Sequence, residues 1–95
     1  MKFTKHAKTR VAERGITEKM ILEVISQPFQ TYYDLSTGTS IVFKKLNKKH
    51  LLVAYSKEDS EIKIVTTFIT SDAQEIISRK LKSKIWVKIG ESRIR

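Results

Sequence analysis

The chain has 95 residues, enough for one domain with a single modest core, and its 40% hydrophobic and 31% charged residues are typical of a folded domain. It contains no cysteine, which excludes disulfides, thiol catalysis and zinc sites built from cysteine. The 19 Lys and Arg residues outnumber 10 acidic residues, and the net charge of +9 favours nucleic acid or an acidic protein as a partner over a membrane surface. A basic surface that only keeps the protein soluble is the alternative.

The start of the chain predicts two helices. Thr4 is placed to cap the first helix, and the apolar residues of its buried face recur every four positions: Phe3, Ala7 and Val11. Gly15 supplies the left-handed residue that ends this helix. A second helix is predicted from its cap at Thr17 to Pro28, which cannot continue a helix. Its buried face consists of Met20, Ile21, Val24 and Ile25.

After the proline, the hydrophobic period changes from helical to extended. Four strands are predicted, with polar turns between them: 29–35, 40–46, 51–56 and 61–70. The last two strands carry apolar residues on both alternating faces, which is typical of central strands that are covered on both sides. In the fourth strand, alternation places one apolar set on each face, Ile62, Ile64 and Phe68 against Val65 and Ile69.

The end of the chain predicts a third helix and a basic tail. Ser71 and Gln74 form a capping-box pattern that opens the helix. Residues 85–89 form either a further strand or an arm, and Trp86 anchors to the domain's own core, to a second copy or to a partner protein. Helices followed by a block of strands predict an α+β fold with an antiparallel sheet, in the order α-α-β-β-β-β-α. We expect one domain over residues 1–95, with a core in 3–70 and a C-terminal helix and basic tail in 71–95.

The first helix carries a pattern that suggests chemistry. His6, Arg10 and Arg14 drift by only about 40° at each four-residue step, so they form one ridge at the edge of the buried face. The helix dipole and the neighbouring Arg10 both favour a neutral His6 imidazole, which can accept a proton. The two guanidinium groups suit phosphate oxygens. A proton acceptor beside fixed positive charge is what metal-free RNA cleavage requires. In the alternative, His6 is a spectator and the arginines pair with Glu13 or with acids of the second helix.

The string HAKTRVAERGIT, residues 6–17, resembles the opening of the DUF4258 family, and Val65-Thr66-Thr67-Phe68 resembles a later segment of that family. The resemblance covers about residues 3–70. The family is similar to the RelE/ParE-like toxins, which share the ribonuclease fold of barnase, EndoU and colicins. The resemblance implies two helices packed on a four-stranded antiparallel sheet, toxin-like endoribonuclease activity and an acidic antitoxin partner. It points to His6, Arg10, Arg14 and Thr66 as catalytic residues. The Thr66 hydroxyl can donate to a phosphate oxygen, although a threonine in a strand is more often simply a good β-former.

Further basic and aromatic residues are candidates for RNA binding. Lys44, Lys45 and Lys48 surround a predicted turn and can contact the RNA backbone, although such a turn is usually a solvated hairpin. Tyr55 can stack on a base or belong to the core. The two histidines lack ligand spacing and there is no glycine-rich phosphate loop, so we expect no metal and no cofactor.

Three functional hypotheses follow from the sequence: a metal-independent endoribonuclease toxin, a non-catalytic nucleic-acid-binding module, and a protein-interaction domain with a basic face. The predicted partners are RNA and an acidic antitoxin, and a homodimer through the C-terminal tail is a further predicted association. No apolar stretch is long enough to span a membrane, and the first residues lack the apolar core of a secretory signal. We therefore expect a cytoplasmic protein without a membrane partner.

Overall fold

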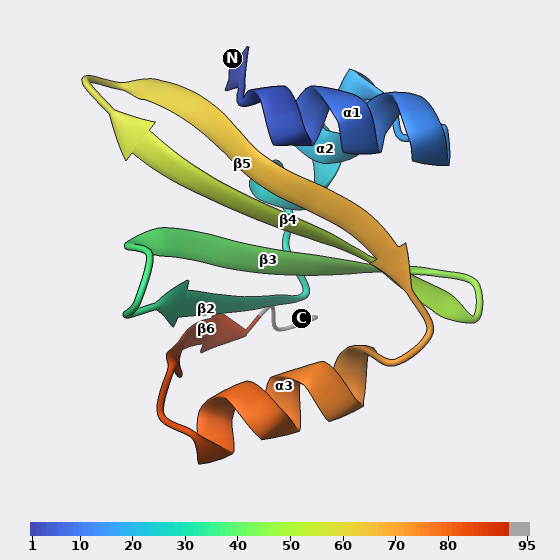
Figure 1. Cartoon of the computed structure of the whole chain (residues 1–95). Helices are drawn as coiled ribbons and strands as arrows, with labels where there is room; N and C mark the ends of the chain where they lie inside the picture. The colour runs from blue at the N-terminus through green and yellow to red at the C-terminus, as the bar shows by residue number, and fades with distance from the viewer. Residues whose placement is uncertain (92–95) are drawn as a thin grey trace.

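The structure is a computed structural model that describes residues 1–91, and within them six strands form one sheet with helices on both faces (Figure 1). The elements in chain order are β1 (Lys2–Phe3), α1 (Lys5–Arg14), α2 (Glu18–Ser26), β2 (Gln30–Asp34), β3 (Thr39–Leu46), β4 (Lys49–Glu58), β5 (Glu61–Thr70), α3 (Ala73–Lys82) and β6 (Trp86–Glu91). Arg93 and Arg95 of the predicted basic tail lie outside the described residues. No helix within residues 1–91 is long and apolar enough to cross a membrane.

The sheet is larger than the four-stranded antiparallel sheet that the sequence predicts. Its strand order is β1-β5-β4-β3-β2-β6, so the four predicted strands form the middle and one additional strand lies at each edge. Strand β1 pairs with β5 in parallel, and the remaining pairs are antiparallel. The α+β class is confirmed, whereas the purely antiparallel sheet and the order α-α-β-β-β-β-α are wrong, because β1 precedes the helices and β6 follows α3.

Thr4 joins α1 to strand β5. Its hydroxyl accepts the backbone N–H of Ala7 at 3.1 Å, as an N-cap should, and donates to the carbonyl of Val65 at 2.8 Å. Its own N–H donates to the carbonyl of Ile64 at 3.0 Å. One short side chain therefore satisfies an orphan donor of the helix and attaches the start of that helix to a central strand.

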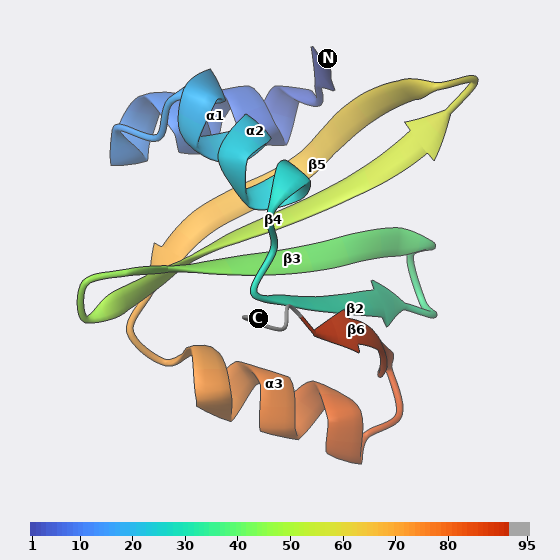
Figure 2. The same cartoon turned by 180° about the vertical axis from the view of Figure 1, so that it is seen from behind.

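Helices α1 and α2 cover one face of the sheet and α3 covers the other (Figures 1 and 2). Each face has its own hydrophobic core. The core under α1 and α2 consists of Ala7, Ile16, Ile21, Val24, Val42, Leu51, Val53 and Ile64. The core under α3 consists of Tyr32, Ile41, Phe43, Leu52, Ala54, Ala73, Ile77 and Trp86. Leu51 and Val53 therefore face one side while Leu52 and Ala54 face the other, which confirms the prediction of a strand covered on both faces.

Residues 86–91 form β6, an edge strand that pairs antiparallel with β2. The strand alternative for this segment is confirmed and the arm alternative is wrong. Trp86 is 4% exposed and stacks on Tyr32 with 5.6 Å between ring centroids, so it anchors to the domain's own core. Trp86 thus completes an aromatic cluster with Tyr32 and Phe43.

Gly15 ends α1 in a left-handed conformation, with φ 65° and ψ 26°. An added Cβ would meet no atom within 4 Å, so a substitution would cause no steric clash. Its cost would come only from holding a residue with a side chain in the left-handed backbone conformation. We expect Gly15→Ala to lower the free energy of unfolding by about 1 kcal/mol, measured by urea denaturation. Gly15→Asn should cost less, because asparagine tolerates this conformation. Equal stability of all three proteins would contradict the prediction.

Candidate functional site

His6, Arg10 and Arg14 form a ridge along α1, called the α1 ridge below. His6 and Arg14 are exposed and Arg10 is half-buried, while Ala7 on the neighbouring stripe is fully buried against the core that β5 helps to form. The ridge therefore lies at the border of the buried face, as its spacing predicts. The helix that carries it is attached to the sheet through Thr4, so the three side chains start from a firmly placed backbone.

The three side chains of the α1 ridge have no hydrogen bond or ion pair with any other residue in the described part of the chain. The alternative in which Glu13 or the second helix pairs with the arginines is therefore wrong. Within residues 1–91 the ion pairs are Lys2–Glu61 at 3.8 Å and Lys44–Glu23 at 3.1 Å. The guanidinium groups are free to bind an external anion, and the unbalanced charge would attract it.

Thr66 does not lie with the α1 ridge. Its backbone pairs with Ala54, and its side chain lies with Leu52 and Phe68 on the face that α3 covers. The cause is a bulge in β5: Ala54 pairs with Thr66 but the next residue, Tyr55, pairs with Ile64. The extra residue, Val65, reverses the alternation of faces. Grouping Ile62, Ile64 and Phe68 on one face is therefore wrong, and so is a site that joins the Thr66 hydroxyl to the ridge.

The predicted RNA-contacting residues also fail to form one surface. Lys44 lies on the side of α2 and pairs with Glu23, whereas Lys45 follows it on the opposite face of β3 and Lys48 lies in the turn after β3. Tyr55 pairs with Ser40, at the other end of the β3–β4 ladder, and packs against the α1–α2 core. The core alternative for Tyr55 is therefore confirmed.

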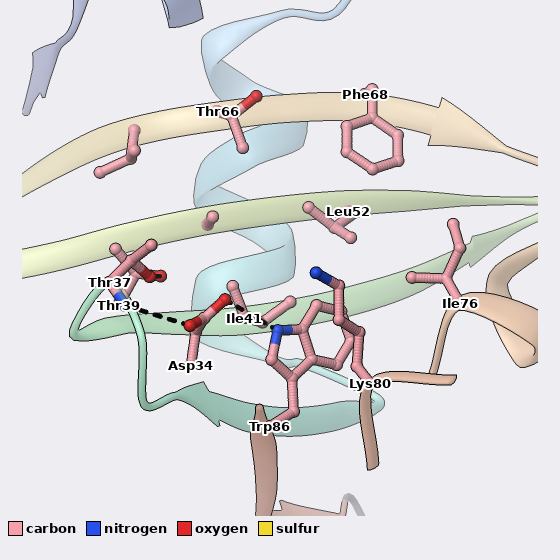
Figure 3. Close-up of a pocket in the computed structure, with 12 residues that line it drawn as sticks. Asp34, Thr37, Thr39, Ile41, Leu52, Thr66, Phe68, Ile76, Lys80 and Trp86 are labelled. Atoms are coloured by element: carbon pink, nitrogen blue, oxygen red, sulfur yellow. Dashed lines mark hydrogen bonds between the residues drawn. The ribbon is translucent and has the colours of Figure 1, made fainter. Parts of the chain in front are cut away.

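A pocket of about 280 Å³ opens between the sheet and α3 (Figure 3). Its polar side is formed by Asp34, Thr37, Thr39 and Thr66, and its apolar side by Ile41, Leu52, Ala54, Val65, Phe68, Ile76 and Trp86. Lys80 from α3 completes the lining, and its ammonium group points over Trp86 (Figure 3). We call this the α3 pocket. Hydroxyls, a carboxylate and an ammonium group around an apolar floor are typical of a small-molecule site.

Asp34 accepts several hydrogen bonds at the polar side of the α3 pocket. Its Oδ1 accepts from the Ser36 N–H at 2.8 Å, the Ser36 hydroxyl at 2.6 Å and the Thr37 N–H at 3.1 Å. Its Oδ2 accepts from the Trp86 Nε1–H at 3.0 Å. Burial raises the pKa of Asp34, but these hydrogen bonds, from Ser36 and Trp86 above all, outweigh it and lower the pKa below 3.8. The pocket therefore contains a carboxylate that stays ionised.

The family model for a domain of unknown function (DUF4258) matches residues 3–69, which is most of the chain. The protein belongs to the DUF4258 family. No curated protein and no solved structure matches the chain. The DUF4258 segment contains the α1 ridge, Thr66 and Asp34, whereas Lys80 and Trp86 come from the elements that follow it. One wall of the α3 pocket is therefore built by the part of the chain outside the family match.

The sequence of this DUF4258 chain does not by itself indicate that Asp34, Lys80 and Trp86 belong to one site. The run Asp34-Leu35-Ser36-Thr37 carries a usable signal, because an aspartate side chain often accepts from the backbone two residues further on. Nothing local predicts the contact between Asp34 and Trp86, which lie 52 residues apart. Lys80 could be recognised only as one of many lysines.

Proposed function

We propose that this DUF4258 domain is a metal-independent endoribonuclease of the RelE/ParE-like toxin type and acts in the cytoplasm. The observation that carries the proposal is the α1 ridge, where an exposed imidazole and two unpaired guanidinium groups share one side of an anchored helix. His6 and Arg14 are exposed and Arg10 is half-buried, which leaves all three groups within reach of an RNA strand. Their chemistry suits a reaction that removes a proton while negative charge grows on a phosphate.

The proposed reaction uses the RNA's own 2′-hydroxyl. His6 takes its proton as the 2′-oxygen attacks the adjacent phosphorus, and Arg10 and Arg14 hold the non-bridging oxygens, where negative charge increases. The bond from phosphorus to the 5′-oxygen breaks, and the leaving oxygen receives a proton from the imidazolium or from water. The products carry a 2′,3′-cyclic phosphate and a 5′-hydroxyl. No oxidant, metal or cofactor enters this balance.

An acidic antitoxin is the proposed protein partner. The net charge of +9 and the unpaired cations of the α1 ridge support it, since a carboxylate-rich chain would neutralise the surface that binds phosphates. RNA and such a protein would compete for the same cations. Binding of an acidic antitoxin should therefore inhibit cleavage, and the inhibition should weaken as salt concentration rises.

The test is cleavage of purified single-stranded RNA by the full chain in the presence of a chelator. We expect fragments that end in a 2′,3′-cyclic phosphate, and no cut where a single 2′-deoxynucleotide replaces the ribose at a mapped position. An intact RNA at every protein concentration would refute the proposal. Cleavage at the 2′-deoxy position would refute the mechanism, because the attacking oxygen is then absent.

A second candidate function is RNA binding without cleavage. It is favoured by the placement of Thr66 on the other face and by the fact that no described side chain hydrogen-bonds to the His6 ring and orients it. In this case the α1 ridge only grips phosphates, and the chelator experiment yields binding but no products.

Both candidates make the same prediction for the arginines. We expect Arg10→Gln and Arg14→Gln each to reduce the slope of log K against log salt for single-stranded RNA by about 0.7, the value for one lost phosphate contact. Fluorescence anisotropy of a labelled oligonucleotide between low and physiological salt measures the slope. Lys57→Gln, at the exposed end of β4, is the matched control for loss of one charge. Unchanged slopes for both arginine variants would exclude the α1 ridge as the phosphate contact.

A further inference from the structure

The α3 pocket has the size and lining for one flat heteroaromatic ring. Its volume of about 280 Å³ lies just below the usual range for small-molecule sites, which begins at roughly 300 Å³. Leu52 and Ile41 of the sheet form an apolar floor, and Phe68 and Trp86 add aromatic surface (Figure 3). A ring buried there would gain dispersion and stacking contacts, and these contacts would be similar for every nucleobase.

The polar side of the α3 pocket offers an acceptor that is not saturated. A carboxylate oxygen has two lone pairs, and Oδ2 of Asp34 receives one hydrogen bond from the described residues, from Trp86. Its remaining lone pair can accept an N–H of a bound ring. The Thr37 and Thr39 hydroxyls bond to each other at 2.8 Å, and the Thr66 hydroxyl has no partner among the described residues. The pocket can therefore form hydrogen bonds with the polar edge of a bound ring.

Lys80 provides positive charge at the same place. Its ammonium nitrogen lies 6.0 Å from the centre of the Trp86 ring, and it forms no ion pair with a described acid. An ammonium group without a counter-ion beside an aromatic wall suits a ligand that carries a phosphate next to its ring. The ligand that combines these features is a nucleotide.

We propose that the α3 pocket binds one RNA nucleotide whose base carries an exocyclic amino group, which donates to Asp34 while Lys80 contacts the phosphate. The choice of RNA rests on the proposed function. The site lies on the opposite face of the sheet from the α1 ridge, and strand β5 connects the two. The start of α1 is hydrogen-bonded to the Ile64 and Val65 carbonyls of β5. Val65 and Thr66 of the same strand line the pocket. The pocket thus selects which base enters, separately from the cations that hold the strand.

Trp86 reports directly on the pocket, because it is the only tryptophan of the chain. Its fluorescence is followed while the full chain is titrated with cytidine monophosphate, uridine monophosphate or ribose 5-phosphate. We expect cytidine monophosphate to bind about tenfold more tightly than the uridine compound, whose carbonyl faces Asp34 in place of the amino group. Ribose 5-phosphate should leave the signal unchanged. Equal affinities, or a response to ribose 5-phosphate alone, would overturn the proposal.

A short cytidine-rich RNA distinguishes a base in a strand from a free nucleotide. We expect it to displace cytidine monophosphate and to bind more tightly, since further phosphates reach the basic surface. If the free nucleotide binds and the RNA does not, the pocket is a mononucleotide site and the RNA part of the proposal is refuted.

Two pocket variants provide the protein side of the test. Thr66→Val keeps the side-chain shape and removes a hydroxyl without a described partner, and Lys80→Gln removes the charge. Each should weaken cytidine monophosphate binding about five- to tenfold, and unchanged affinity in both would count against the site. Lys82→Gln, on the exposed surface of the same helix, is the matched control.

The outcomes separate this proposal from the proposed function. If the chain cleaves no RNA but the Trp86 titration shows the cytidine preference, nucleotide binding in the α3 pocket is supported and the endoribonuclease activity is refuted. If the parent, Thr66→Val and Lys80→Gln all cleave RNA with the same base preference, base selection by the α3 pocket is refuted and the endoribonuclease activity is supported.

Discussion

Replacing His6 with alanine should lower the rate of RNA cleavage by about 10²- to 10⁴-fold, the range for loss of a general base. Binding of the RNA should change little, because Arg10 and Arg14 retain the phosphate contacts. The folded state should also be unaffected, since the His6 side chain is exposed and forms no hydrogen bond with a described residue. Single-turnover cleavage with saturating protein measures the chemical step separately from binding.

The control is His50→Ala, which removes the other histidine of the chain from a half-buried position on β4. It should cleave RNA like the parent. Added imidazole offers a further check, because an exposed site on α1 leaves room for a free imidazole to replace the missing side chain. Partial recovery of His6→Ala and no effect on the parent would assign proton transfer to His6. Equal cleavage by His6→Ala and the parent would remove His6 from the mechanism.

Replacing Asp34 with alanine should lower the free energy of unfolding by about 3 kcal/mol. The indole N–H of Trp86 loses its acceptor inside the α3-side core, where an unsatisfied donor costs roughly 1–3 kcal/mol, and the turn at Ser36 and Thr37 loses the acceptor for its N–H groups. Urea denaturation monitored by circular dichroism measures the loss. A double-mutant cycle with Trp86→Phe isolates the Asp34–Trp86 hydrogen bond, and a coupling energy near zero would contradict its role.

The Asp34 contribution should depend on pH in one direction. Burial raises the pKa of Asp34, but its hydrogen bonds lower the pKa by more than burial raises it. The pKa in the folded state therefore lies below the ordinary value of 3.8. The unfolded chain then binds the proton first as pH falls, so the stabilisation is complete above about pH 4 and declines below it. Asp34→Asn cannot titrate at this position. The stability difference between parent and Asp34→Asn should therefore shrink below pH 4, and a constant difference would contradict the lowered pKa.

The sequence by itself determined the features that depend on neighbours along the chain. Thr4 and Gly15 bound α1 because a cap and a left-handed residue act within one helical turn. The α1 ridge follows from a four-residue spacing for the same reason. The alternation in β4 also held, since each residue of a regular strand reverses direction relative to the last.

Only the tertiary structure decided where distant groups meet. The bulge at Val65 moves Thr66 to the α3 face, because one extra residue in a strand exchanges the two faces for everything after it. The pairing of β6 with β2 brings the Trp86 indole to Asp34 across 52 residues. Such contacts are selected by the energy of burying an aromatic ring and satisfying a buried donor together, and no local pattern in the sequence encodes that sum.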